Sequence, residues 1–363
     1  MKIMHIAQMI QGGLASYLNE ILPFQRRALG NGTVLVVIPK NEIDFIDIRD
    51  PHMFRTFSTN RRSIAGLTSF LFNVVRLIHD EKPDIIHLHS TFAGALIRLW
   101  FLIVPWRRPK IIYCAHGWAF NMQVSEYLRR TYALFERIFA RTTDAIVCIS
   151  EYEYEEAKRR RLPKSLLHCI PNGIRDKAVM RGHGAHVFNP ATLNLLFVGR
   201  QDRQKGYDIL IDAMKSLQGL PIMLHVVGEA VVSIEDRNPA YPNVTLHGWK
   251  SRDEVEAFLA DADALVMPSR WEGFGLIALE AMRQELPVCA SAVDALPELV
   301  QHGVSGFLFP SENVDALANL LASLDRSSLQ KIGPNGRHWY LNNFTADRMN
   351  NSLIDLYRRQ IPT

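Results

Sequence analysis

Short apolar runs alternate with amphipathic stretches along the whole chain. The runs that predict buried strands are rich in Ile, Val and Leu, and they cover residues 2–7, 33–38, 84–89, 110–115, 144–149, 166–170, 193–198, 222–227, 244–248, 264–267 and 287–290. Helical periodicity covers residues 14–29, 64–79, 91–104, 125–141, 252–261, 276–283, 313–324, 328–341 and 345–359, and a further helix is predicted to begin at Ser150. This alternation predicts an α/β protein with parallel, doubly wound sheets. Residues 40–62 are charged and irregular, and we expect a connection there.

The length of 363 residues suggests two domains. Residues 175–192 hold Arg, Gly, His, Asn and Pro without periodicity, and we interpret them as the linker. The expected domains are therefore residues 1–172 and 190–344.

Composition favours a soluble, cytoplasmic enzyme. Hydrophobic residues make up 48% and charged residues 21% of the chain. We find no apolar run long enough for a transmembrane helix and no secretory signal pattern. The cysteines have no paired or metal-ligand spacing, so we expect reduced core thiols at Cys114, Cys148, Cys169 and Cys289.

The net charge of +4 is unevenly distributed. Residues 1–170 contain 23 Lys and Arg against 15 Asp and Glu, a balance of +8, whereas the remainder has 18 against 22, a balance of −4. Such an asymmetry suggests that the first half faces something anionic, either nucleic acid or an anionic membrane surface. A solvated basic face without a partner is the alternative.

The segment that carries most of the chemistry follows the apolar run 264–267. It consists of Pro268, a turn containing Gly273 and Gly275, and a helix from Leu276 onward. A strand, a glycine loop and a helix start direct free amides and the positive end of a helix dipole at an anion. The carboxylates of Glu272 and Glu280 would repel phosphate, so we expect them to bind hydroxyl groups. A nucleotide sugar has phosphates in its middle and hydroxyls at both ends.

This segment resembles the signature of glycosyltransferase family 4, in which two glutamates are separated by seven residues. The resemblance implies the GT-B fold, in which two Rossmann-like domains face each other across a cleft. It further implies that the backbone at Gly273, Phe274, Gly275 and Leu276 holds the donor diphosphate. Glu280 would bind the ribose and Glu272 a hydroxyl of the transferred sugar.

A second match lies in the stretch Gly199–Asp208, which resembles the family's Gly-Arg…Lys-Gly motif through Arg200 and Lys205. An arginine and a lysine on one loop can stabilise the charge of a leaving diphosphate by charge-assisted hydrogen bonds. The alternative is a solvated charged loop, in which Asp202 and Arg203 pair with each other.

The first half contributes weaker matches. Gly12 and Gly13, after a strand, resemble the family's first loop, where glycines approach the donor diphosphate; the chain lacks the G-x-G-x-x-G of dinucleotide binders. His116, at a strand end, resembles a histidine that reaches the donor sugar, although a histidine satisfied by a loop carbonyl is the alternative.

Further matches are Ile149–Ser150, 171–174, 297–300 and 303–308, and Gly248 and Trp249 match the base-binding loop loosely. The family's last helix returns to the first domain, so residues 345–363 are expected there.

The resemblance implies a retaining, metal-independent transferase that needs no cofactor besides its nucleotide-sugar substrate, with a UDP-sugar favoured over a GDP-sugar. A two-step route through Glu272 and a front-face reaction, in which the leaving phosphate accepts the acceptor's proton, are both compatible with retention. Asp261-Ala-Asp263 matches a metal motif only superficially, because it joins a helix end to a buried strand. His87 and His89 have no other metal ligands near them in sequence, and we interpret them as structural or acceptor-side residues.

The acceptor is expected at the first domain. Residues 96–104 are apolar on nearly all sides, and the basic stretch 106–110, with Arg107 and Arg108, follows them. Such a segment is either a buried core helix or a helix that dips into an anionic leaflet. Together with the basic excess, the second interpretation favours a peripheral enzyme at the inner face of the cell membrane. Its expected acceptor is a glycan or a polyprenyl-diphosphate-linked sugar, in surface polysaccharide or glycolipid synthesis.

Three other classes are weighed against the transferase. A nucleotide-sugar epimerase of the same fold would need acid and base groups around the sugar ring, whereas the spacing of Glu272 and Glu280 favours the transferase. A nucleic-acid-binding protein is disfavoured because the basic residues are scattered and show no recognition motif. A nucleotide-sugar-binding protein without transferase activity stays open, although no motif position is visibly lost.

Overall fold

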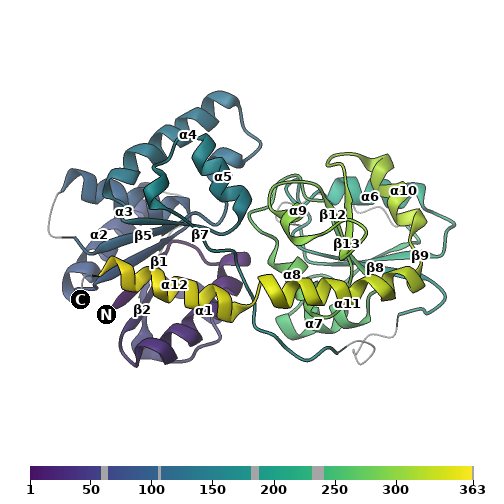
Figure 1. The fold of residues 1–363 in the computed structure, drawn as a ribbon, viewed down its shortest axis with the longest axis horizontal. Helices are drawn as coiled ribbons and strands as arrows, with labels where there is room; N and C mark the ends of the chain where they lie inside the picture. Colours follow the sequence, from purple (N-terminus) through teal and green to yellow (C-terminus); the bar gives the residue numbers. More distant parts are fainter. Residues whose placement is uncertain (59–63, 105–107, 181–187, 231–240, 362–363) are drawn as a thin grey trace. The chain divides into compact units, whose positions relative to one another are not determined.

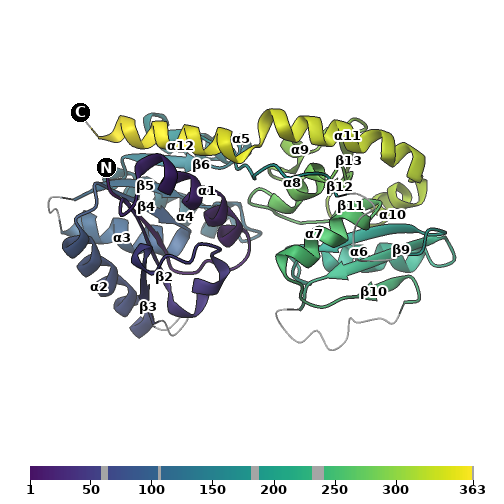
Figure 2. The ribbon, with the colours of Figure 1, turned by 90° about the horizontal axis from the view of Figure 1, so that it is seen from below.

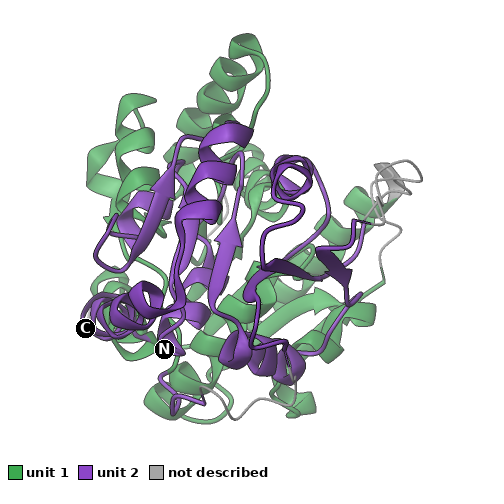
Figure 3. Cartoon of the chain, turned by 90° about the vertical axis from the view of Figure 1, so that its right-hand side faces the viewer, with its two compact units in different colours: residues 1–175, 346–363 green, residues 176–345 purple. Residues whose placement is uncertain are grey.

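A computed structural model describes residues 1–58, 64–104, 108–180, 188–230 and 241–361. The chain forms two compact units (Figure 3). Unit 1 comprises residues 1–175 and 346–363, and unit 2 comprises residues 176–345. Lys177 pairs with Glu256, and the Met180 amide donates to Gln284 Oε1 at 2.7 Å, so residues 176–180 are attached to unit 2. The central part of the expected linker, residues 181–187, lies outside the described residues.

Unit 1 is built on a seven-stranded parallel sheet in the order β3-β2-β1-β4-β5-β6-β7. Its strands are β1 Ile3–Ala7, β2 Val34–Pro39, β3 Phe54–Phe57, β4 Ile85–His89, β5 Lys110–Cys114, β6 Ala145–Cys148 and β7 Leu167–Cys169. Its α-helices are α1 Gly13–Leu29, α2 Ile64–Glu81, α3 Thr91–Ile103, α4 Glu126–Phe139, α5 Glu151–Arg159 and α12 Ala346–Gln360. Short 3₁₀ turns cover Lys40–Phe45, Pro51–Met53, Ala119–Asn121, Ala140–Thr142 and Lys164–Leu166.

The two faces of this sheet are covered differently. Alternate strand residues such as Met4, Ile6 and Leu88 pack with α2, α3, α4 and α5 in one core. The opposite face carries His5 and His87, which contact α1 and α12. The last helix lies along α1 (Figures 1 and 2).

Unit 2 repeats the plan with a six-stranded parallel sheet in the order β10-β9-β8-β11-β12-β13. Its strands are β8 Leu193–Val198, β9 Ile222–Val227, β10 Val244–Leu246, β11 Ala264–Met267, β12 Val288–Ser291 and β13 Gly306–Phe309. Its helices are α6 Tyr207–Ser216, α7 Arg252–Asp261, α8 Leu276–Arg283, α9 Leu296–Leu299, α10 Val314–Ser323 and α11 Arg326–Asn343. Helices α6 and α10 pack on β8, β9 and β11 in its main core.

Both sheets reverse their strand order at one position, between β1 and β4 in unit 1 and between β8 and β11 in unit 2. In doubly wound sheets the loops at the carboxyl ends of these strands diverge and leave room for a ligand. The expected doubly wound, parallel architecture is therefore confirmed. It gives each unit one candidate ligand site, at the carboxyl ends of the two strands where the strand order reverses.

Four of the strands and helices that the structure describes were not expected from the sequence. Strand β3 lies within residues 40–62, where no regular element was expected, and it pairs only with β2 in the ladders described. Helices α6 and α9 and strand β13 also lie where no helix or strand was expected. Among the described helices, none combines the length and apolar character needed to cross a membrane.

Candidate active site

Two loops meet at the carboxyl edge of the unit 2 sheet. The loop Gly199–Gly206 follows β8, and the loop 268–275 follows β11. The Arg270 amide donates to the Gln204 carbonyl at 2.8 Å. A Cβ added to Gly206, whose φ is 66°, would lie 1.9 Å from the Pro268 carbonyl oxygen, so the close approach of the loops requires glycine there.

The expected cation and carboxylate meet between these loops. Lys205 Nζ lies 2.6 Å from Glu272 Oε2, and the two side chains are 22% and 10% exposed. Ser269 Oγ donates to the same oxygen at 3.2 Å, and the Glu272 amide donates to Asp294 Oδ2 at 2.7 Å. The ammonium and the carboxylate are thus held at the strand ends by contacts on both sides.

Arg200 lies on the same loop and is more exposed, at 54% of its side chain. Its guanidinium donates to Gln204 Oε1 at 2.8 Å and lies 3.1 Å from Asp202 Oδ2. Asp202 also accepts from the Lys205 amide at 2.9 Å. The alternative pairing of Asp202 with Arg203 is therefore wrong: Asp202 pairs with Arg200 and shapes the loop.

Helix α8 begins at this edge. Its N-cap is Gly275, in the left-handed region with φ 96°. Phe274 is 3% exposed and packs edge-on against Phe344, which anchors the turn, while Gly273 and Leu276 are half-buried. Glu280 is 9% exposed, about one turn along α8. The first-turn amides and the helix dipole suit an anion at this end.

Gly248 and Trp249 follow β10. The Gly228 amide donates to the Gly248 carbonyl at 2.8 Å, and the Trp249 amide donates to Glu229 Oε1 at 3.3 Å. The Gln201 amide donates to the Glu229 carbonyl at 3.1 Å, which links this turn to the Arg200 loop. The Trp249 side chain is 66% exposed at this edge.

Arg270 holds the two loops together, a role that sequence reasoning missed. It forms a two-point hydrogen bond with Asp208 of α6, at 2.7 and 2.8 Å. It also donates to Glu312 at 2.7 Å and to the Arg203 carbonyl at 2.9 Å. Burial alone would raise the pKa of Asp208, but Arg270 outweighs it and lowers that pKa; the same carboxylate raises the pKa of Arg270.

The Gly12–Gly13 turn occupies the equivalent position after β1 in unit 1. Gly12 is the N-cap of α1 with φ 75°, and both glycines are exposed. A Cβ added to either would meet nothing within 4 Å, so the backbone borders open space. The Ile10 amide donates to the buried carboxylate of Glu42 at 2.6 Å, which anchors the turn.

His116 follows β5 in the left-handed region, with φ 55°. Its Nε2 lies 2.9 Å from His89 Nδ1, and the Tyr17 ring packs edge-on against it at 4.6 Å. His89 in turn contacts His5. His116 is therefore hydrogen-bonded to another imidazole and not, as in the alternative interpretation, to a loop carbonyl. The sequence did not indicate that ring nitrogens of His5, His87 and His89 lie within 4.8 Å of one another.

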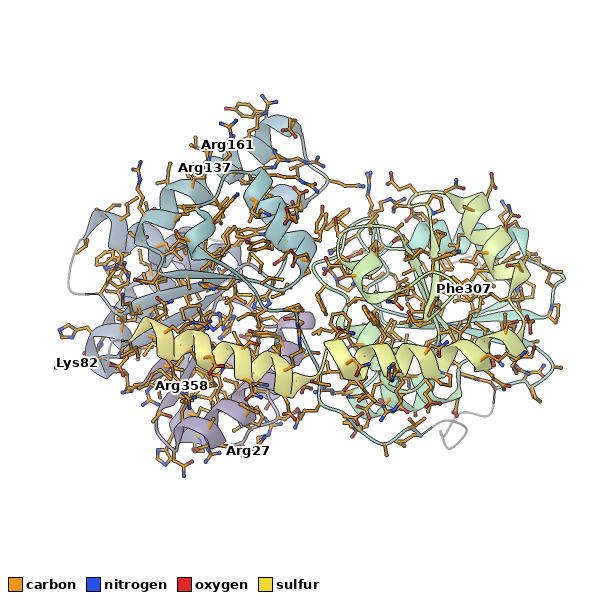
Figure 4. All side chains as sticks on the ribbon, viewed as in Figure 1. Arg27, Lys82, Arg137, Arg161, Phe307 and Arg358 are labelled. Atoms are coloured by element: carbon orange, nitrogen blue, oxygen red, sulfur yellow. The ribbon has the colours of Figure 1, made fainter. Side chains whose placement is uncertain are left out.

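The apolar segment 96–104 has features of both expected interpretations. Ile97, Arg98 and Phe101 of α3 are buried, and Arg98 Nη1 pairs with Glu136 Oε2 at 2.9 Å. Large apolar side chains are exposed on the neighbouring α3 and α4, namely Phe92, Leu99, Ile103, Tyr127, Leu128, Leu134 and Phe135. Figure 4 labels two basic side chains of this part of unit 1, Arg137 of α4 and Arg161, which follows α5.

Two other expectations concern charged residues. Arg108 pairs with Asp144, so it is not the free headgroup contact that the sequence suggested, and Arg107 lies outside the described residues. Asp263 accepts from Arg326 at 2.7 and 2.9 Å and from the Asn194 amide at 2.8 Å, so its oxygens are occupied.

The four cysteines are free, and Cys169 is half-buried rather than buried.

Comparison with known proteins identifies the class. The model of glycosyltransferase family 4 matches residues 11–177, and the model of glycosyl transferases group 1 matches residues 183–339. An uncharacterized glycosyltransferase of Methanocaldococcus jannaschii is 30% identical over 285 residues, which cover 75% of each chain. The protein therefore belongs to this glycosyltransferase family.

Other relatives match over most of their length. An uncharacterized 41.2 kDa protein in the cps region of Klebsiella pneumoniae is 29% identical, covering 99% of each chain. The UDP-Gal:alpha-D-GlcNAc-diphosphoundecaprenol alpha-1,3-galactosyltransferase of Escherichia coli is 25% identical, covering 79% of this chain and 78% of its own.

Solved structures share the fold. Anabaena HepE in complex with UDP-glucose matches with a TM-score of 0.79 at 20% identity, covering 99% of this chain and 100% of its own. Sucrose-phosphate synthase from Thermosynechococcus elongatus matches with a TM-score of 0.81 at 24% identity, covering 99% of this chain and 98% of its own. These likenesses establish the GT-B architecture.

Proposed function

We propose that this glycosyltransferase moves a sugar from a uridine-diphosphate donor to a glycan or polyprenyl-diphosphate-linked acceptor, in the synthesis of a surface polysaccharide or glycolipid. One observation carries the proposal: Lys205 and Glu272 meet at the unit 2 switch point, next to the glycine-capped start of α8. The E. coli relative names a UDP donor and a diphosphoundecaprenol acceptor, and the Klebsiella relative is encoded in a cps region. HepE binds UDP-glucose.

The donor's parts are assigned by charge. Arg200, Lys205 and the amides of residues 273–276 hold the diphosphate, because they supply positive charge and free N–H groups. Glu280 accepts from the ribose hydroxyls, and Glu272 accepts from a hydroxyl of the transferred sugar. The turn at Gly248 and Trp249 holds the base. From unit 1, Gly12 and Gly13 approach the diphosphate, and His116 contacts the sugar.

The same residues suggest how the glycosidic bond breaks. Negative charge grows on the diphosphate as it leaves, and Lys205 and Arg200 stabilise that charge without a metal ion. Glu272 is paired with an ammonium and a serine hydroxyl, which makes its oxygen a poor nucleophile. A front-face reaction with retention follows, in which the leaving phosphate accepts the proton of the acceptor hydroxyl.

We propose further that the outer faces of α3 and α4 contact an anionic membrane. Leu99, Ile103, Leu134 and Phe135 are exposed by 40%, 68%, 49% and 49%, respectively. Exposed apolar side chains beside basic residues suit an interface with acidic headgroups. In a flotation assay with anionic liposomes at low salt, the protein should rise with the vesicles, and a double Leu134→Ser and Phe135→Ser variant should not. Absence of flotation by the unaltered protein would remove the membrane contact.

The donor and the reaction are tested separately. Thermal-shift measurements against a panel of UDP- and GDP-sugars should give the largest stabilisation with one UDP-sugar. With that donor, nucleoside diphosphate should be released only after an acceptor is added. Conversion of the donor into another nucleotide sugar, without release, would instead identify an epimerase; binding without either reaction would identify a sensor.

A further inference from the structure

A chain of buried side chains connects His116 with helices α1 and α12. His116 Nε2 lies 2.9 Å from His89 Nδ1, and His89 Nε2 lies 3.0 Å from His5 Nδ1. His5 Nε2 lies 2.7 Å from Gln25 Oε1 of α1. His5, His89 and Gln25 are at most 1% exposed, and only His116 among these four reaches the surface.

The far end of the chain is fixed by Tyr357 of α12. Gln25 Nε2 donates to the Tyr357 hydroxyl at 3.3 Å, so the carbonyl oxygen of Gln25 faces His5. The hydroxyl also lies 2.7 Å from His87 Nδ1 and can donate its own hydrogen there.

The order of hydrogens follows from the donor and acceptor inventory. A carbonyl oxygen only accepts, so His5 carries its hydrogen on Nε2. A neutral imidazole has one N–H, which leaves His5 Nδ1 bare, so it accepts from Nε2–H of His89. The same step places a hydrogen on Nε2 of His116 and leaves its Nδ1 as an acceptor.

Burial keeps these rings neutral at pH 7, as this order requires. It lowers the pKa of His5 to about 4 and that of His116 to about 3, and it lowers the pKa of His89 and of His87 well below the ordinary 6.5.

We propose that Gln25, His5 and His89 form a hydrogen-bonded relay that holds His116 as the neutral Nε2–H tautomer, with Nδ1 available to accept a hydrogen bond from a hydroxyl of the donor sugar. Gln25, His5 and His89 are positioning residues, because they act through His116. The relay is formed without a bound nucleotide sugar, whereas its effect on turnover rests on the proposed function. A neutral acceptor suits this reaction, since an imidazolium would repel the positive charge that develops on the sugar as the bond breaks.

The geometry favours a relay over a metal site at His5, His87 and His89. The 3.0 Å contact between His5 and His89 is a hydrogen-bond distance between ring nitrogens. A zinc ion needs lone pairs of all its ligands aimed at one point at about 2.0–2.1 Å. The group also contains no carboxylate to balance a buried dication.

Long-range ¹H–¹⁵N spectra of the full-length protein, labelled with ¹⁵N-histidine, test the relay, since they distinguish the two neutral tautomers. In the unaltered protein, His5, His89 and His116 should all be Nε2–H. Gln25→Leu removes the acceptor at the chain's end and should convert His116 to a tautomer mixture. Gln25→Glu retains a carbonyl-type acceptor and should restore the Nε2–H form. Gln284→Leu, the same change at a buried glutamine of unit 2, should leave the His116 signals unchanged.

An Nδ1–H signal for His116 in the unaltered protein overturns the relay, as does an unchanged His116 tautomer in a folded Gln25→Leu variant. The first measurement requires no variant, so it decides the question even if Gln25→Leu misfolds. With the donor found by the thermal-shift panel, Gln25→Leu should lower kcat by roughly tenfold or more, and Gln25→Glu should recover most of it. If His116→Ala keeps full activity while the spectra match expectation, the relay stands and the proposed role of His116 fails.

Discussion

The ammonium of Lys205 and the carboxylate of Glu272 lie 2.6 Å apart, and each neutralises the charge of the other. In the proposed donor complex, the ammonium would exchange part of its contact with the carboxylate for contact with the diphosphate. The carboxylate keeps Ser269 and can accept from a sugar hydroxyl. The ion pair keeps both side chains oriented in the absence of a ligand, and under the proposed function this would reduce the reorganisation needed during the reaction.

Lys205→Ala should lower turnover by roughly 10²-fold or more, the scale of losing one charge-stabilising donor. Steady-state release of nucleoside diphosphate with saturating donor measures the effect. Lys215→Ala, at an exposed lysine of α6, is the matched control and should keep normal turnover. Near-normal activity of the Lys205 variant would refute the assignment.

Gly13 allows a test of ligand approach that is separate from folding. A Cβ there meets no atom of the protein within 4 Å, and the residue starts α1, where alanine is a better helix former. Gly13→Ala should therefore leave the Tm unchanged or slightly raised, while the donor KM rises about tenfold because the methyl group occupies the space of the diphosphate.

Gly12→Ala serves as the contrasting variant. Its φ of 75° suits glycine, so alanine should cost about 1 kcal/mol of stability in addition to any loss of binding. An unchanged donor KM in Gly13→Ala would show that the turn does not border the ligand.

At the scale of elements, one arginine sets the geometry of the unit 2 site. Arg270 joins the loop after β11 to α6 through Asp208, and its side chain is 10% exposed. Arg270→Met should lower the free energy of unfolding by roughly 1–3 kcal/mol at pH 7, between the values for exposed and buried pairs. The pKa of Asp208 is lowered in the folded protein, so the stabilisation is present above the unfolded value and is lost as the pH falls through the folded one.

Urea unfolding of the Arg270→Met variant and of the unaltered protein, from pH 7 down toward pH 3, measures this difference. The gap between them should shrink as the pH drops below about 4. Arg76→Met removes an exposed pair with Asp80 and should change stability by less than about 0.5 kcal/mol. A gap that stays constant with pH would show that Asp208 is not the partner that matters.

What the sequence could predict depended on local signals. Strand runs and helical periodicity are local, so most elements were found, and parallel pairing follows from their alternation. Strand β3 was missed because it has only four residues, Phe54–Phe57, and lies at the edge of the sheet. Four residues are too few to show a clear alternation of apolar and polar side chains. Motif spacing identified Lys205 and Glu272, but no local signal indicates that Arg270 meets Asp208, 62 positions away, or that His5 meets Gln25 on a helix.

At the scale of the whole molecule, helix α12 belongs to unit 1, the unit that begins with strand β1. The sequence supplied this only through the family resemblance, because the periodicity of residues 345–359 does not say which core they complete. Met349, Leu353, Ile354, Leu356 and Tyr357 of α12 are buried, and Asn350 donates to the Glu20 carbonyl of α1 at 3.1 Å. Unit 1 is therefore completed by residues made after unit 2.

Ending the chain after Thr345 should unfold unit 1 and leave unit 2 folded. Five buried side chains, at about 1.5–3 kcal/mol each, contribute on the order of 10 kcal/mol, which is comparable with the whole stability of a domain. Hydrogen exchange measures the result: amides of β4 and β5 should lose protection, while those of β8 and β11, whose core lies within unit 2, should keep it. Ending the chain after Gln360 keeps all of α12 and should preserve protection in both sheets. Retained protection of β4 and β5 in the longer deletion would mean that α12 is dispensable for unit 1, and the relay through Tyr357 would then need another anchor for Gln25.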